Sequence, residues 1–232
     1  MRYRALATDY DGTLATHGKV DQETIRTLRL FAASGRDLIM VTGRELADLK
    51  CVFSQLSLFT RVVAENGALL YDPAENRETL LCEAVRETFV AALRRRGAPV
   101  SAGRAVVATV QPHEEAVRQT IREMHLPLQV SLNKGSIMVL PEGVNKTTGL
   151  RKALTELGIT EDVVVAIGDA ENDIDFLEAC GCGVAVANAL PSVKLRAQLT
   201  TCGAHGAGVV EIMDQLLAND GFPCEGRVPV PE

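Results

Sequence analysis

The sequence predicts an α/β protein with a doubly wound parallel sheet and a small α+β domain inserted into it. Three observations support this fold. Short apolar strands alternate with amphipathic helices in the first third of the 232-residue chain and again in its last third. The stretch between them carries helix-strand-strand patterns instead. Polar residues follow the predicted core strands, at the sheet edge where ligands bind in this class of fold.

The N-terminal part is predicted to begin the parallel sheet. Residues 3–8 and 38–41 are apolar runs that suit buried strands. Between them, Asp21 can cap a helix that ends near Gly35. A second helix is expected after residue 45 and has Leu46, Leu49 and Leu56 directed inward, and strands at 61–64 and 68–71 surround the turn Asn66-Gly67.

The C-terminal part repeats this rhythm. A helix over residues 147–157 is predicted to end at Gly158. Residues 163–167 form an apolar run fit for a strand that is covered on both faces, and another strand is expected at 184–187. Strands that alternate with helices imply parallel pairing with right-handed crossovers.

The middle of the chain is predicted to be a separate α+β domain. Helices at 83–96 and 114–124 are each followed by strands, and residues 133–135 make a tight turn. Pro73 and the segment Pro141-Glu142-Gly143 mark hinges. We assign residues 1–74 and 142–220 to a discontinuous core domain, 75–141 to the inserted domain and 221–232 to an irregular tail rich in Pro and Gly.

Composition excludes several classes of protein. A formal charge of −6 argues against a partner with a nucleic-acid backbone. No apolar run approaches the roughly 20 residues of a membrane span, and Asp9 comes too early for a signal peptide, so we expect a cytoplasmic protein. Six cysteines without metal-site spacing are read as small buried thiols. Both a monomer and a homodimer are compatible with the sequence.

Two acidic clusters follow predicted core strands. Asp9 and Asp11 come directly after the first strand, and Gly12 lets the backbone turn there. Asp169 and Asp173 follow the strand 163–167, four residues apart at the start of a helix. Like charges about 4 Å apart repel by roughly 4 kcal/mol at an effective dielectric of 20, so such clusters favour a cation or a shared proton. Oxygen ligands of this kind suit Mg²⁺.

Two further features indicate an anion site. Thr42-Gly43-Arg44 ends another core strand and offers a hydroxyl and a flexible backbone amide at the start of a helix. Lys146 opens a later helix, where a cation is locally unfavourable by a few tenths of a kcal/mol. A lysine at that position is therefore expected to have a function, such as holding a phosphoryl oxygen.

The ordered set of motifs resembles the haloacid dehalogenase superfamily of phosphatases. The matching elements are Asp9-x-Asp11-Gly12-Thr13-Leu14, Thr42-Gly43-Arg44, Lys146 and Gly168-Asp169-x-x-Asn172-Asp173. The insertion between Thr42 and Lys146 is similar to the type IIB cap of the Cof-like subgroup. In its short length, this insertion is similar to the minimal cap of archaeal phosphoglycolate phosphatase and sucrose-phosphatase relatives.

The resemblance implies specific roles for these residues. Asp9 would be the nucleophile, and Asp11 the general acid and then the general base. Asp9, Asp11 and Asp169 would bind Mg²⁺, with Asn172 and Asp173 completing or orienting the site. Thr42, Gly43 and Lys146 would hold the phosphoryl group, and Arg44 is a candidate for binding the substrate.

The resemblance also implies hydrolysis of a small phosphorylated metabolite, a sugar phosphate or phosphoglycolate, through an aspartyl-phosphate. Arg104 and Lys134 are further candidates for a second anionic group of such a substrate. Three alternatives stay open: a phosphomutase or phosphotransferase, a dehalogenase, and a phosphate-binding regulatory module without turnover.

Overall fold

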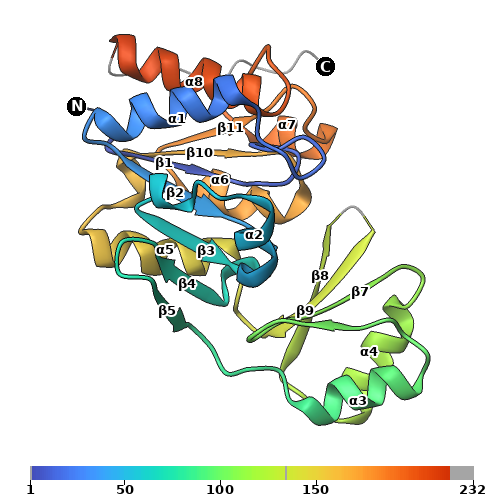
Figure 1. Cartoon of the computed structure of the whole chain (residues 1–232). Coiled ribbons are helices and arrows are strands. Elements are labelled where there is room, and N and C mark those ends of the chain that lie inside the picture. Colours follow the sequence, from blue (N-terminus) through green and yellow to red (C-terminus); the bar gives the residue numbers. More distant parts are fainter. Residues whose placement is uncertain (1, 134, 220–232) are drawn as a thin grey trace.

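The computed structural model describes residues 2–133 and 135–219 and shows two domains (Figure 1). In the larger domain the described residues form a sheet of eight strands in the order β12-β11-β10-β1-β2-β3-β4-β5. In the inserted domain they form an antiparallel sheet in the order β6-β7-β9-β8. The predicted α/β core with an inserted α+β domain is therefore confirmed.

The large sheet is parallel in its centre and is wound in both directions from β1. Strand β1 pairs with β2 on one side and with β10 on the other, so the order of the chain reverses between β1 and β10. Ligands bind at such a reversal, outside the carboxyl ends of the strands. The parallel strands are β1 (Ala5–Thr8), β2 (Asp37–Val41), β3 (Arg61–Ala64), β10 (Val164–Gly168), β11 (Cys182–Ala185) and β12 (Leu199–Thr200). Strand β4 (Leu69–Asp72) pairs antiparallel with β3, and β5 (Arg77–Leu80) pairs antiparallel with β4.

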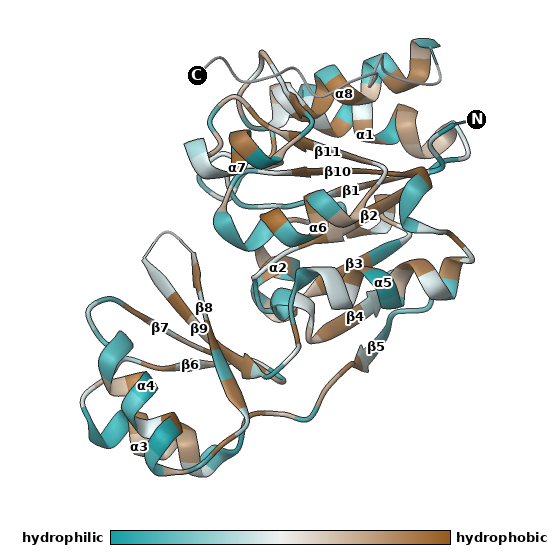
Figure 2. Ribbon diagram, turned by 180° about the vertical axis from the view of Figure 1, so that it is seen from behind, coloured by the Kyte–Doolittle hydropathy of each residue, from teal (hydrophilic) through white to brown (hydrophobic). Residues whose placement is uncertain are grey.

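Helices cover both faces of this sheet. Helices α1 (Gln22–Ala33) and α8 (Gly206–Asn219) pack together on one face, and α5 (Lys146–Leu157) and α6 (Ile174–Ala179) lie on the other (Figure 1). Figure 2 shows the central strands β1, β10 and β11 as largely apolar, as expected for strands buried on both faces, while the helices mix hydrophilic and hydrophobic residues. Two short helices, α2 (Leu46–Val52) and α7 (Pro191–Arg196), complete the domain, with single turns η1 (Leu56–Leu58), η2 (Glu65–Gly67), η3 (Glu161–Val163) and η4 (Glu171–Asp173).

Local signals explain several helix ends. The side chain of Asp21 accepts a hydrogen bond from the backbone N–H of Thr24, as predicted for the cap of α1. Helix α5 begins after Asn145, which accepts from the N–H of Thr148, and ends at Gly158 in the left-handed conformation. The predicted second helix is shorter than expected, because α2 ends at Val52 and the chain continues through the separate turn η1.

The inserted domain packs helices α3 (Glu87–Arg95) and α4 (Glu114–Glu123) against its antiparallel sheet. Its strands are β6 (Ser101–Ala102), β7 (Val107–Val110), β8 (Leu128–Asn133) and β9 (Ser136–Pro141). The expected boundary at residue 75 needs correction, because β5 pairs with β4 in the large sheet and the chain leaves the core only after it. We refer to this inserted domain as the cap.

Some predictions fall on residues that the structure does not describe. Lys134, and with it the centre of the predicted turn at 133–135, lies outside the described residues, as does the predicted tail at 221–232. Across residues 2–133 and 135–219, no helix has both the length and the apolar character that a membrane crossing requires.

Candidate active site

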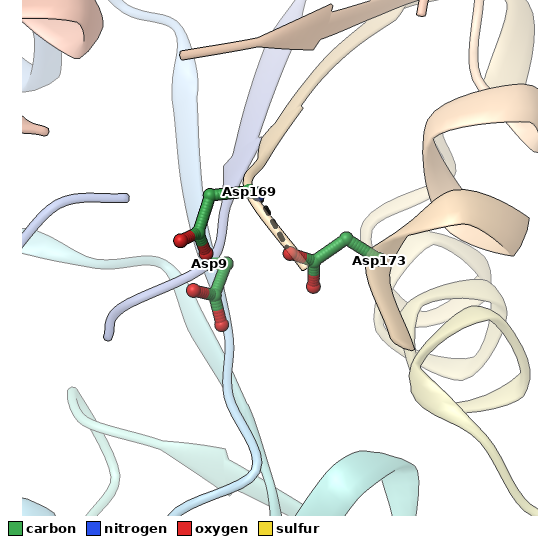
Figure 3. A group of neighbouring side chains, drawn as sticks. All are labelled: Asp9, Asp169 and Asp173. Atoms are coloured by element: carbon green, nitrogen blue, oxygen red, sulfur yellow. Dashed lines mark hydrogen bonds between the residues drawn. The ribbon is translucent and has the colours of Figure 1, made fainter. Parts of the chain in front are cut away.

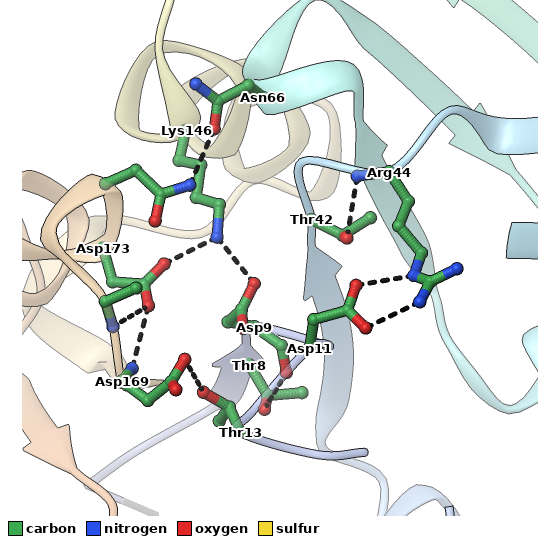
Figure 4. A network of polar contacts seen from close by, with 12 residues as sticks. Thr8, Asp9, Asp11, Thr13, Thr42, Arg44, Asn66, Lys146, Asp169 and Asp173 are labelled. Carbon is green, nitrogen blue, oxygen red and sulfur yellow. Dashed lines mark hydrogen bonds and ion pairs between the residues drawn. The ribbon is translucent and has the colours of Figure 1, made fainter. Parts of the chain in front are cut away.

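The predicted site residues converge where the central strands end. Asp9 follows β1, Thr42 follows β2 and Asp169 follows β10, and these three strands are neighbours in the sheet. Lys146 approaches from the N-terminus of α5. Figure 4 shows these side chains directed toward one another. Parallel pairing thus brings together residues that are far apart in the sequence.

Three buried carboxylates form the centre of the site. Asp9, Asp169 and Asp173 each offer an oxygen within 4.8 Å of the other two. Figure 3 shows the three side chains as one group. Asp173 is held in place by its Oδ2, which accepts hydrogen bonds from the backbone N–H groups of Asp169 (2.8 Å) and Ala170 (2.9 Å). Gly168 is needed for this turn, because a Cβ there would lie 2.6 Å from the Cβ of Asp173.

Lys146 is the counter-ion of this cluster. Its side chain is buried, and its Nζ lies 2.6 Å from Oδ1 of Asp9 and 2.6 Å from Oδ1 of Asp173. Burial alone would lower the pKa of Lys146, but the two carboxylates outweigh it and hold the pKa above its ordinary value. Lys146 therefore stays charged, and three ionised carboxylates with one ammonium would leave the site with a surplus of two negative charges.

Ionisation of Asp9 is disfavoured in this site. Burial raises the pKa of Asp9 to about 8, and the charges of Asp173 and Asp169 act in the same direction, while Lys146 opposes them. A divalent cation would neutralise this surplus. The donors are hard carboxylate oxygens, the type that Mg²⁺ prefers, so the residues present fit a magnesium ion.

Two polar side chains flank the cluster. The hydroxyl of Thr13 donates to Oδ1 of Asp169 at 3.2 Å. Asn172 donates to Oδ1 of Asn66 at 3.1 Å, while its own Oδ1 is buried and has no hydrogen-bond partner among the described residues. A buried acceptor without a partner is unfavourable, so Asn172 is suited to accept from a bound ligand of the site.

The side chain of Asp11, a residue predicted to bind the metal, lies outside the carboxylate cluster. Its oxygens accept from Nε (2.5 Å) and Nη2 (2.8 Å) of Arg44, a bidentate pair. Arg44 also bonds Asp48 at 2.5 Å and lies over the ring of Tyr10, 5.5 Å from its centroid. The guanidinium is thus already paired with two carboxylates, which weakens its predicted role in binding an anionic substrate group.

Residues 42–44, which we call the Thr42 loop, lie opposite the carboxylate cluster. Thr42 is buried, and its Oγ1 accepts from the backbone N–H of Arg44 at 3.1 Å. Gly43 faces the cap, because a Cβ there would lie 3.3 Å from Sδ of Met138. A side chain at position 43 would therefore press against the cap.

A cavity of about 570 Å³ lies between the core and the cap, directly above Asp9. The cap side of its wall is uncharged and consists of Ser101, Val106, Ala108, Ser136 and Met138. Among the described residues that line the cavity, Arg44 is the only cation. This volume suits a small metabolite.

Glu65, for which the sequence predicts no role, also lines the cavity. Its carboxylate is buried and accepts three backbone hydrogen bonds from the cap segment 104–106. The sequence did offer one signal for this residue, because Glu65 is a charged residue between an apolar strand and an Asn-Gly turn. Arg104, a predicted anion ligand, instead pairs with Glu78 at 2.7 Å.

Comparisons with known proteins agree with this geometry. The sequence profile of the family described as haloacid dehalogenase-like hydrolase matches residues 6–95 and 105–213. A phosphoglycolate phosphatase of Methanothermobacter thermautotrophicus is 31% identical over 92% of this chain and 99% of its own length. The phosphoglycolate phosphatase 2 of Saccharolobus solfataricus is 30% identical over 93% of each protein.

Solved structures share the fold at lower identity. A haloacid dehalogenase-like hydrolase from Bacteroides thetaiotaomicron superposes with a TM-score of 0.76 at 18% identity, covering 92% of this chain and 99% of that one. A sugar phosphatase of haloacid dehalogenase subclass IIB gives 0.77 at 19% identity, covering 92% and 98%. The profile match and the related sequences show that this chain belongs to the haloacid dehalogenase-like hydrolase family and is an enzyme of its phosphatase class.

Proposed function

We propose that this enzyme is a magnesium-dependent phosphatase that hydrolyses a small phosphorylated metabolite through an aspartyl-phosphate on Asp9. The observation that carries the proposal is the buried group of Asp9, Asp169 and Asp173 beside Lys146, which would carry two net negative charges with all three carboxylates ionised. Such a group is unfavourable without a cation, and it lies at the base of a cavity of metabolite size.

The three clustered carboxylates are assigned to hold Mg²⁺. Asp173, which was predicted to complete or orient the site, is added to the residues assigned to the metal, because its oxygen lies within 4.8 Å of those of Asp9 and Asp169. Bound Mg²⁺ supplies the positive charge that allows an anionic nucleophile to approach an anionic phosphate. Asn172, with its unpaired buried oxygen, is assigned to accept a hydrogen bond from a ligand of the site.

The remaining residues are assigned to the chemistry and to phosphate binding. Asp9 attacks the phosphorus and displaces the leaving alcohol, which takes a proton from Asp11. Asp11 then removes a proton from the water that cleaves the Asp9 phosphate. Thr42, the N–H of Gly43 and Lys146 hold phosphoryl oxygens, and they stabilise the charge that spreads over these oxygens in the transition state.

For Asp11 to reach the leaving oxygen, its carboxylate must turn away from Arg44, to which both its oxygens are bonded in this structure. We therefore assign Arg44 the role of holding Asp11 until substrate enters. Arg44→Lys would keep the charge but lose the bidentate geometry.

The substrate is proposed to carry an uncharged leaving group, as in a sugar or polyol phosphate. The uncharged cap wall and the pairing of Arg44 with Asp11 and Asp48 support this. Phosphoglycolate, which carries a second negative charge, is the competing candidate because the two curated relatives described above are named for it. Measuring kcat/KM for a polyol phosphate and for phosphoglycolate decides between the two candidate substrates, because the preferred substrate has the higher value.

Phosphate release from p-nitrophenyl phosphate tests the proposed reaction. We expect turnover with Mg²⁺, none with EDTA, and loss of at least about a thousandfold in Asp9→Asn. Asp214→Asn, on the exposed surface of α8, is the matched control and should keep full activity. Folded protein without metal-dependent turnover contradicts the proposal, and full activity in Asp9→Asn removes Asp9 as the nucleophile.

A further inference from the structure

The turn η2 joins the core to the cap through one buried side chain. Glu65 is 1% exposed, and its Oε1 accepts from the backbone N–H of Arg104 at 2.9 Å. Its Oε2 accepts from the N–H groups of Ala105 at 2.8 Å and Val106 at 3.1 Å. These three donors belong to the turn between β6 and β7, inside the cap and outside both hinges. One core carboxylate therefore satisfies three cap amides.

The backbone conformation of η2 directs Glu65 into the cap. Glu65 (φ 50°) and Asn66 (φ 55°) are both left-handed, a conformation uncommon for residues other than glycine. The cap is shaped to receive the carboxylate, because a Cβ on Gly103 would lie 2.7 Å from Oε2 of Glu65. Strain on the core side and a close approach on the cap side both serve this single contact.

The turn η2 is also hydrogen-bonded to the Thr42 loop. The N–H of Glu65 donates to the carbonyl of Arg44 at 2.9 Å, and the N–H of Asn66 donates to the carbonyl of Thr42 at 3.0 Å. On its other side, Nδ2 of Asn66 donates to the hydroxyl of Ser131 in β8 at 3.3 Å. The turn η2 therefore links the Thr42 loop to two separate parts of the cap.

We infer that Glu65 is a positioning residue that holds the cap closed over the substrate cavity and couples its position to the Thr42 loop. Val106, whose N–H Glu65 accepts, also lines the cavity, so loosening this contact displaces the cavity wall itself. Glu65 lies in the core and is bonded to amides rather than to the reacting groups. Its loss should weaken substrate binding more than the chemical step.

Hydrogen exchange of Glu65→Gln tests the contact without relying on any activity. Gln has one acceptor oxygen, so it cannot satisfy all three donors. We expect the amides of Arg104, Ala105 and Val106 to exchange at least about tenfold faster, while amides in α1 and α4 stay unchanged. Unchanged protection at residues 104–106, or an equal increase throughout the core, overturns the inference.

Two further variants separate this contact from general destabilisation. Gly103→Ala places a methyl group against the carboxylate from the cap side and should reproduce the faster exchange without changing the core. Glu78→Gln removes the charge from the pairs that Glu78 makes with Arg104 (2.7 Å) and Lys50 (3.0 Å), and it is the matched control, with less than twofold effect on exchange at residues 104–106. An effect of Glu78→Gln as large as that of Glu65→Gln contradicts a specific role for Glu65.

The kinetic readout rests on the proposed phosphatase function. With p-nitrophenyl phosphate and Mg²⁺, Glu65→Gln should raise KM about tenfold and change kcat less than threefold. A fall in kcat at constant KM overturns the positioning role. If the wild-type enzyme shows no turnover, the proposed function fails, and hydrogen exchange still decides the inference about Glu65.

Discussion

Replacing Asp9 with Asn is predicted to stabilise the metal-free protein while it abolishes activity. In the absence of metal, burial raises the pKa of Asp9 from 3.8 to about 8. Between these values the folded protein binds a proton that the unfolded chain has released. The free energy of unfolding must therefore fall as the pH rises through this window.

The size of the effect follows from the pH interval. From pH 3.8 to pH 7 the interval is about three units, and each unit corresponds to about 1.4 kcal/mol. Asp9 therefore lowers the stability of the metal-free fold by about 4 kcal/mol at pH 7. Asn carries no charge and still offers an oxygen to the Nζ of Lys146, which lies 2.6 Å from Oδ1 of Asp9 in the wild type.

Urea denaturation in EDTA at pH 4, 5.5, 7 and 8 measures this difference. We expect Asp9→Asn and wild type to be equally stable near pH 4 and to diverge to about 4 kcal/mol in favour of the variant at pH 7. Saturating Mg²⁺ should reduce or reverse the difference, because the metal stabilises the ionised wild-type site. Equal stability at pH 7 in EDTA, or a less stable variant, would refute the reasoning. Asp214→Asn serves as the control.

Three further predictions concern stability, each measured by urea denaturation. Lys146→Met removes the counter-charge of Asp173 and the hydrogen-bond donor to Asp9 and should lower the free energy of unfolding by about 3 to 5 kcal/mol in EDTA, with partial rescue by Mg²⁺. Gly67→Ala should cost more than about 2 kcal/mol, because φ is +103° and the new Cβ would lie 1.9 Å from the carbonyl oxygen of Asn145. Asp21→Ala removes the side chain that accepts a hydrogen bond at the N-terminus of α1 and should lower the free energy of unfolding by about 1 kcal/mol at pH 7. Burial would raise the pKa of Asp21, but the hydrogen bonds from Thr24 outweigh it and lower the pKa below 3.8, so this difference should narrow as the pH falls through the folded pKa. If Lys146→Met or Gly67→Ala has the same free energy of unfolding as the wild type, the argument for that residue is contradicted. For Asp21→Ala, a loss of stability that does not change with pH contradicts the argument.

Most core elements could be predicted because their signals are local. Apolar runs such as residues 38–41 read as buried strands, and Asp21 and Gly158 mark helix ends by their own side-chain or backbone chemistry. Strand β5 was missed because it lies at the sheet edge and its four residues are mostly exposed, so it lacks the apolar pattern of a buried strand. The boundary of the cap was misplaced for the same reason.

The candidate site could be predicted in part. Asp9 and Asp169 follow apolar strands, and two parallel strand ends must lie at the same edge of the sheet, so their proximity follows from the topology. Which second carboxylate of each pair joins them could not be predicted. Asp11 is drawn to Arg44, 33 residues along the chain, while Asp173 is turned inward by two backbone N–H groups.

By itself, the sequence determined the fold class and the family, because hydrophobic periodicity and the order of the motifs can be read along the chain without knowing which residues meet. Only the tertiary structure decided which charges meet. The bond between Lys146 and Asp9 joins residues 137 apart in sequence, and that between Glu65 and Ala105 joins residues 40 apart across two domains. Such contacts depend on distances of a few ångströms and on the burial that strengthens them, and neither quantity exists until the sheet and the cap have packed.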